Sequence, residues 1–95
     1  MDKTEIIQPR IFPDDRGYLQ ELYHAEHSET VFDGRPIKQI IHSFSEPGVL
    51  RGLHYQWPLP MGKFVMCLQG EVLDVAIDLR RDSPSYGFNS SCLLR

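Results

Sequence analysis

Three side chains with useful chemistry stand close together in the middle of this sequence. Arg51 and His54 lie three residues apart in the apolar run VLRGLHYQ, residues 49–56, and Lys63 follows a short segment that contains two prolines. An imidazole can take up and return protons near neutral pH. An ammonium group can stabilise an oxyanion, and a guanidinium can hold a phosphate through paired hydrogen bonds. This combination predicts proton abstraction next to a carbonyl group on a phosphorylated substrate.

Each of these residues also has a structural interpretation. His54 can be a core histidine that bonds a backbone carbonyl, and Arg51 can be an edge cation that reaches solvent. Strict strand alternation places the two side chains on opposite faces, unless Gly52 introduces a β-bulge. The catalytic interpretation predicts an imidazole beside an open cavity with an ammonium group opposite. A ring packed among aliphatic side chains, or one free in bulk water, would contradict it.

The elements that must position these groups are predicted to be short strands. Alternation is clearest over residues 72–79, where Leu73, Val75, Ile77 and Leu79 share one face and Asp74, Ala76 and Asp78 share the other. We expect further strands at residues 5–7, 18–23, 37–44, 49–56 and 63–68. Turns are expected at 14–17, 45–48 and 69–71, the last joining 63–68 and 72–79 into a hairpin. One helical turn is expected near Ser28. Residues 1–95 are therefore expected to form one mainly-β domain, a sandwich or a barrel.

Composition narrows the classes of partner. The chain has 95 residues, 41% of them hydrophobic, and a net charge of -3. Its ten Lys and Arg residues are scattered, which argues against nucleic acid as a partner. The sequence shows neither a signal peptide nor an apolar window of membrane-spanning length. Two cysteines without metal-type spacing predict reduced thiols and a cytoplasmic location.

The ordered motifs of the chain resemble those of the dTDP-4-dehydrorhamnose 3,5-epimerase family. These motifs are DDRGYLQE (14–21), VLRGLHYQ (49–56), GKFV (62–65), GEVLDVAIDLR (70–80) and DSPSYG (82–87). The resemblance implies an all-β, cupin-like jelly roll, incomplete in this chain, and a homodimer that exchanges N-terminal strands. It also implies an isomerase without cofactor or metal that epimerises dTDP-4-dehydro-6-deoxyglucose at C3 and C5, in dTDP-L-rhamnose biosynthesis.

The resemblance assigns roles to six residues of this chain. His54 matches the base that removes the protons next to the C4 ketone, and Lys63 matches the lysine near the enolate oxygen. The other four match nucleotide- and substrate-binding residues: Arg16, Glu21, Gln39 and Arg51. Such a pocket also explains why a strand would carry an arginine and a histidine, because buried polar groups need partners.

The chain also departs from the family pattern. Ile41 stands where the family has Asn, and the loop from His54 to Lys63 is one residue shorter. Family members continue past residue 95, through the tyrosine that acts as general acid and the aspartate that orients the histidine. We therefore expect a truncated member. The alternative function is a weak or inactive homologue that binds the nucleotide sugar or pairs with another chain.

Other residue pairs give weaker alternatives. His24 and His27 have a spacing that suits a metal on a helix, but a third ligand is not evident and a polar surface loop is the favoured explanation. Asp74 and Asp78 could be paired acid–base carboxylates or a solvated face. A metal-binding cupin is a third hypothesis, and it lacks the usual HxH pair because Tyr55 follows His54.

Overall fold

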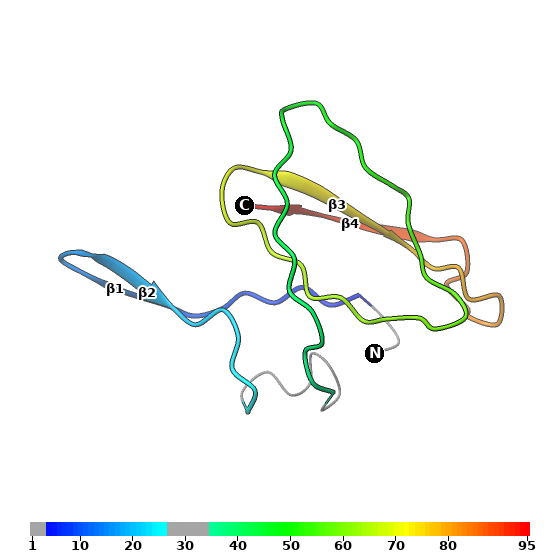
Figure 1. Ribbon diagram of the computed structural model, residues 1–95, viewed down its shortest axis with the longest axis horizontal. Coiled ribbons are helices and arrows are strands. Elements are labelled where there is room, and N and C mark those ends of the chain that lie inside the picture. Colours follow the sequence, from blue (N-terminus) through cyan, green and yellow to red (C-terminus); the bar gives the residue numbers. More distant parts are fainter. Residues whose placement is uncertain (1–3, 27–34) are drawn as a thin grey trace.

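The structure of the chain is a computed structural model that describes residues 4–26 and 35–95. Every regular element in these ranges is a strand: β1 (Ile11–Asp14), β2 (Gly17–Gln20), β3 (Val72–Ile77) and β4 (Asn89–Leu94). The strands form two antiparallel hairpins, β1–β2 and β3–β4, which do not contact each other (Figure 1). The prediction of an all-β chain is confirmed. The helical turn expected near Ser28 lies outside the described residues.

The β1–β2 hairpin forms around the predicted turn. Asp14 pairs with Gly17 across a two-residue loop, and the Asp14 carboxylate accepts a hydrogen bond from the backbone N–H of Arg16 (2.8 Å). Gly17 has a φ of +143°, which a residue with a Cβ rarely adopts. Pro13 lies inside β1 opposite Tyr18. A two-stranded ribbon has two open edges, and there a proline without an N–H removes no ladder bond.

The β3–β4 hairpin corrects the predicted pairing of the central strands. The strand predicted at 72–79 is present as β3, but its partner is β4 and not residues 63–68, with Leu73 opposite Leu93 and Val75 opposite Ser91. A hydrogen-bonded loop over residues 78–88 joins the two strands, and in it Gly87 N–H donates to the Asp78 carbonyl (2.8 Å). Alternation fixes which side chains share a face, but it does not select the neighbouring strand.

The strands predicted at 5–7, 37–44, 49–56 and 63–68 are absent from the described structure. Residues 35–60 instead form a long arch that rises to a turn at Pro47–Gly48 and descends again (Figure 1). Val49 N–H closes that turn onto the Glu46 carbonyl (3.3 Å), as predicted for 45–48. Among the described residues, no further backbone–backbone hydrogen bond joins 37–44 to 49–56. Their β propensity favours extended chain, but a strand also needs a ladder partner.

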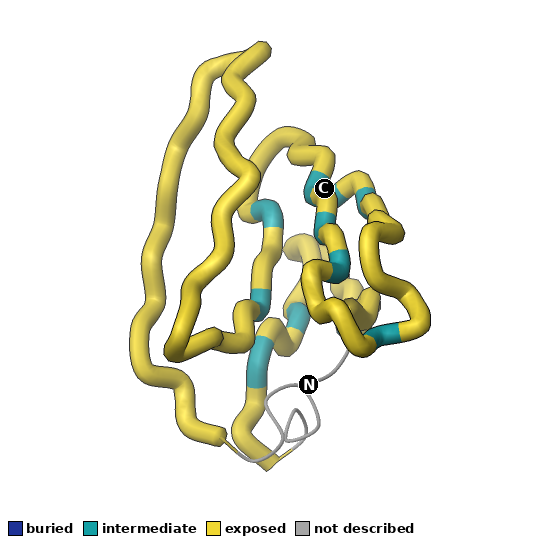
Figure 2. Tube along the Cα trace, turned by 90° about the vertical axis from the view of Figure 1, so that its right-hand side faces the viewer, coloured by how far each residue is buried: buried dark blue, intermediate teal, exposed yellow. Residues whose placement is uncertain are grey.

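Burial is shallow throughout the described residues, none of which is fully buried (Figure 2). On β3, the face with the polar residues is more buried than the apolar face. Asp74, Ala76 and Asp78 are half-buried, whereas Leu73 and Val75 on the other face are exposed. The apolar face of this strand therefore meets solvent in the described structure. No helix in the described ranges is long and apolar enough to span a bilayer.

Candidate functional site

His54 and Lys63 lie on the wall of one open hollow of about 520 Å³. The full lining is His54, Tyr55, Gln56, Pro60, Met61 and Lys63. The hollow is open to solvent, and all of its lining residues are exposed. Because all six residues come from the continuous segment 54–63, the hollow forms where the descending limb of the arch turns back toward β3. The structure therefore brings the predicted base and the predicted ammonium group to one hollow, but His54 is exposed there and not enclosed by walls.

A side-chain hydrogen bond closes the loop that separates the two groups. The Gln56 amide Nε2 donates to the Leu59 carbonyl at 2.5 Å. Pro58 and Pro60 have no N–H, so the loop has few backbone donors for an ordinary turn. Among the described residues, no backbone–backbone hydrogen bond involves positions 56–62. The Gln56 side chain thus takes the place of a turn hydrogen bond.

Arg51 lies just before the hollow and is not among its lining residues. Its guanidinium Nε donates to Ser45 Oγ (2.9 Å), and its Nη2 donates to the Phe44 carbonyl (3.3 Å). The side chain therefore joins the two limbs of the arch close to its turn. Remaining donors of the guanidinium stay available, because arginine has five N–H groups.

The other predicted binding residues lie away from the hollow. Arg16 is at the tip of the β1–β2 hairpin, and Glu21 follows β2. Figure 1 places that hairpin at one end of the longest axis and segment 54–63 toward the other. Gln39 is exposed on the rising limb of the arch. Within this chain, the structure groups His54 with Lys63 but does not group Arg16, Glu21 or Gln39 with them.

Arg16 is engaged locally at the hairpin tip. Its Nη2 makes a 2.9 Å ion pair with the Asp14 carboxylate, and its side chain remains largely exposed. The hydrogen bond from the Arg16 side chain lowers the pKa of Asp14, and the bond from the Arg16 backbone N–H adds to this effect. The ion pair orients Arg16 along the turn, and it is too exposed to contribute much stability.

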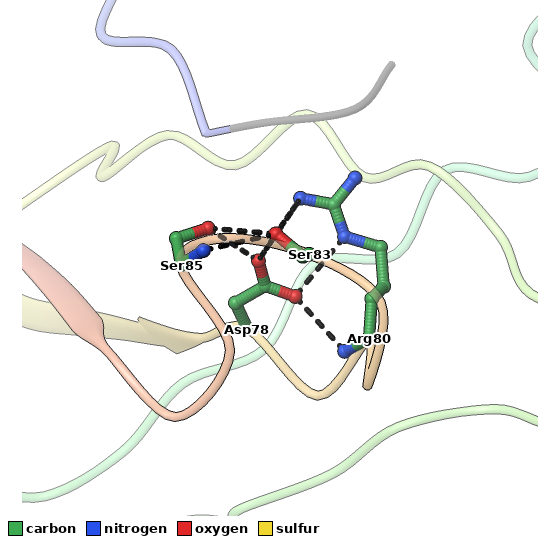
Figure 3. Close-up of polar contacts among 4 residues, drawn as sticks. All are labelled: Asp78, Arg80, Ser83 and Ser85. Carbon is green, nitrogen blue, oxygen red and sulfur yellow. Dashed lines mark hydrogen bonds and ion pairs between the residues drawn. The ribbon is translucent and has the colours of Figure 1, made fainter.

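The carboxylates Asp74 and Asp78 do not form an acid–base pair with the hollow. The Asp78 carboxylate accepts hydrogen bonds from Ser83 Oγ (2.6 Å) and Ser85 Oγ (2.5 Å), and from the Arg80 Nε and Nη2 atoms (both 3.0 Å) (Figure 3). This network holds the loop between β3 and β4 in shape. Asp78 therefore has a structural role in the described chain.

The hypothesis of a metal-binding cupin has no support among the described residues. No group of three or more His, Cys, Asp or Glu side chains lies close enough there to hold an ion. His24 Nδ1 accepts a hydrogen bond from the Glu26 backbone N–H (3.1 Å), and His27 lies outside the described residues. Both cysteines, Cys67 and Cys92, are free thiols.

Sequence reasoning did not assign Gln56, Pro60 or Met61 to the site. A signal for Gln56 was present, because a loop with two prolines in three residues needs a side chain to replace the missing N–H donors. Met61 had no comparable signal. Its place on the wall depends on how the loop folds.

Comparisons with known proteins all point to one family. The sequence profile of the dTDP-4-dehydrorhamnose 3,5-epimerase family matches residues 1–95. A dTDP-4-dehydrorhamnose 3,5-epimerase from Shigella flexneri is 46% identical over 93 residues, which are 90% of this chain and 51% of that protein. One from Pseudomonas aeruginosa is 49% identical over 84 residues, covering 86% of this chain and 46% of that protein. One from Methanothermobacter thermautotrophicus is 41% identical over 91 residues, with coverages of 92% and 47%.

The chain spans about half the length of these curated relatives. No solved structure gives a significant match to it.

Proposed function

Because the chain belongs to the dTDP-4-dehydrorhamnose 3,5-epimerase family, we propose that it takes part in epimerising dTDP-4-dehydro-6-deoxyglucose at C3 and C5, for dTDP-L-rhamnose synthesis. The observation that carries the proposal is the shared hollow of His54 and Lys63. A keto sugar placed there would meet a proton acceptor and a cation on one wall.

The proposed chemistry follows from the two groups. The His54 imidazole removes a proton from the carbon next to the C4 ketone, and the electron pair moves to the ketone oxygen. The Lys63 ammonium stabilises the resulting enolate through charge and a hydrogen bond. Delivery of a proton from solvent water to the opposite face of that carbon inverts its configuration, and the His54 imidazolium releases the abstracted proton to solvent. No metal or redox cofactor takes part in this sequence.

Binding of the nucleotide is assigned to the remaining predicted residues. Arg51 precedes His54 by three residues, and its guanidinium can offer the N–H groups not bonded to Ser45 and Phe44 to the diphosphate. Arg16, Glu21 and Gln39 are proposed to contact the nucleotide and sugar. Since Arg16 lies far from the hollow of its own chain, the proposal brings it to the hollow of a second protomer.

A homodimer that exchanges N-terminal strands would provide that arrangement. The β1–β2 hairpin contacts neither β3 nor β4 in the described chain and projects away from them (Figure 1). An element with free edges is suited to pairing with a neighbouring sheet. In this proposal residues 1–95 are one domain of a cupin-like jelly roll, located in the cytoplasm as its free thiols suggest.

A second function has its own support. The hollow is open, its histidine is exposed, and the chain spans half the length of its relatives. A site of this kind can bind a nucleotide sugar without turning it over. Losing a general acid or an orienting group typically costs ~10²–10⁴-fold in rate. The alternative is therefore a binding protein, or a chain that acts paired with another.

Deuterium wash-in separates the two functions. The keto sugar is incubated in D₂O with the wild-type chain, His54→Ala, Lys63→Met and the matched control His42→Ala, and C3 and C5 are followed by NMR. We expect exchange that falls ~10²-fold or more in His54→Ala and Lys63→Met and persists in His42→Ala, since His42 does not line the hollow. Wild-type binding of dTDP without exchange would support the binding function, and equal exchange in all variants would refute the assigned site.

A further inference from the structure

Between His54 and Lys63, the polar side chain of Gln56 holds the loop in shape. Gln56 lines the hollow and donates its amide to the Leu59 carbonyl at 2.5 Å. A hydrogen bond from position 56 to position 59 spans the same interval as a β-turn bond. Unlike an ordinary turn, this one is closed by a side chain.

The chemistry of the loop explains why such a side chain is needed. Its sequence from 57 to 62 is WPLPMG, and Pro58 and Pro60 contribute no backbone donors. The residues of this segment are exposed, so burial contributes little to holding the loop. Apart from the amide bond, no hydrogen bond joins the two limbs of the described loop. Without that bond, its shape depends on proline stiffness alone.

The loop also lies between the two functional residues of the hollow. His54 lies two residues before Gln56, and Lys63 lies four residues after Leu59. Both wall residues lie in the chain segments that flank the closed loop, so opening the loop would let one move relative to the other. In a reaction that needs a base and an oxyanion stabiliser on the same substrate, a displacement of ~1 Å can cost ~10²-fold in rate.

We propose that Gln56 is a positioning residue: its amide closes the 56–59 loop and thereby fixes Lys63 relative to His54 for work on one substrate. This inference rests on the proposed function for its consequence in catalysis. The closed loop itself is a property of the chain with or without turnover. Gln56 does not need to touch the reacting atoms to act in this way.

The test uses one isosteric variant, one neutral variant and a control. Gln56→Glu keeps the length of the side chain but has no N–H to donate at neutral pH, and Gln56→Met removes the donor without adding charge. Gln69→Glu introduces the same charge at an exposed position outside the hollow. All three are made in the chain of residues 1–95.

The first measurement needs no activity. Trp57 is the single tryptophan of the chain and lies inside the closed loop, so its time-resolved fluorescence anisotropy reports on loop order. We expect the fast component to grow by about twofold in both Gln56 variants and to stay unchanged in Gln69→Glu, because one turn-closing bond is lost. The backbone amide NMR signals of His54 and Lys63 should shift in the same two variants. Unchanged Trp57 order and unchanged signals in both Gln56 variants would overturn the inference.

The second measurement follows deuterium exchange of the keto sugar. In the Gln56 variants we expect the rate at saturating sugar to fall by about tenfold or more, with KM changed less than about twofold, as for lost positioning. An increase in KM with an unchanged saturating rate would mean that Gln56 binds substrate directly, and would overturn the positioning role. Absence of exchange in the wild-type chain would refute the proposed function, and the anisotropy and NMR data would then decide on the loop.

Discussion

Asp78 shows how one charged residue can organise a turn. Its carboxylate accepts hydrogen bonds from Arg80, Ser83 and Ser85 at the point where β3 ends (Figure 3). The Arg80 side chain makes the largest contribution to lowering the pKa of Asp78, and the two serine hydroxyls add to it. Charge-assisted bonds of this kind are stronger than neutral ones. The loop between the strands therefore depends on an ionised Asp78.

The lowered pKa of Asp78 predicts a loss of loop structure in acid. In the unfolded chain an aspartate titrates near ~3.9. A folded pKa below that value stabilises the fold at pH above ~4, and this contribution is lost as pH falls through the lowered folded value. In Asp78→Asn we expect faster amide hydrogen exchange in β3 and β4 at pH 6. The difference from wild type should shrink as pH falls below ~4.

Hydrogen exchange followed by NMR at several pH values checks this expectation. Asp82→Asn serves as the control, since it removes a carboxylate from the same loop. A difference between wild type and Asp78→Asn that stays constant down to pH ~2 would contradict the role of ionised Asp78.

At the scale of elements, the loop between β3 and β4 also requires a special backbone conformation. Gly87 has a φ of +82°, and its N–H donates to the Asp78 carbonyl. A Cβ added at Gly87 would meet nothing within 4 Å. A substitution there would therefore be unfavourable because of its backbone conformation and not because of a clash.

Gly87→Ala is expected to weaken the β3–β4 hairpin by roughly 1–2 kcal/mol, the usual cost of left-handed backbone for a residue with a Cβ. Gly87→Asn should cost less, because asparagine tolerates this region better. The measurement is amide exchange along β4, which we expect to quicken by about fivefold or more in Gly87→Ala. Equal exchange in the two variants would show that the φ of this residue does not control the hairpin.

Local features of these elements could be predicted from the sequence. The turn at 14–17 follows from Asp and Gly within four residues, and the turn at 45–48 follows from Pro and Gly. The strand at 72–77 follows from its alternation. The partner of that strand could not be predicted, because pairing depends on contacts between distant parts of the chain. The hairpin expected between 63–68 and 72–79 was wrong for this reason. The strand at Asn89–Leu94 was missed because its three polar residues, Asn-Ser-Ser, gave no alternation.

The candidate site also has one part that follows from the local sequence and another that depends on distant contacts. His54 and Lys63 are nine residues apart with two prolines between them, so the chain itself brings them to one hollow. Arg16 and Gln39 lie on other elements, and their approach to the hollow would require tertiary or quaternary contacts. The family resemblance supplies their roles, which remain predictions for this chain.

At the scale of the whole molecule, the chain exposes far more surface than a compact domain. Its accessible area is 9359 Å², whereas a folded monomer of 11.0 kDa exposes about 5,600 Å². Its radius of gyration is 15.5 Å, against about 12 Å for a compact chain of this length. Two separate hairpins and a long arch explain both differences (Figure 1). Apolar side chains that a domain would bury are therefore open to solvent.

One regular part of this apolar surface is a face of the β3–β4 hairpin. Leu73 and Leu93 lie opposite each other on that face and are 64% and 47% exposed, with Val75 and Ile77 beside them. Paired strands hold these side chains in a fixed plane, which suits binding of a flat apolar molecule. Leu50 is 93% exposed on the arch but belongs to no sheet. A leucine at each place allows a matched comparison.

We expect the chain to bind 8-anilinonaphthalene-1-sulfonate, a dye that fluoresces on apolar surfaces. The fluorescence should fall by about half or more in the double variant Leu73→Ser/Leu93→Ser, because contiguous apolar patches bind the dye better than isolated side chains. Leu50→Ser should change the signal by less than about a tenth on the same argument. Fluorescence titration at constant protein concentration makes the comparison. Equal losses in the two variants would place the binding surface on exposed leucines in general. The face of β3–β4 would then have no special apolar character, despite its ordered side chains.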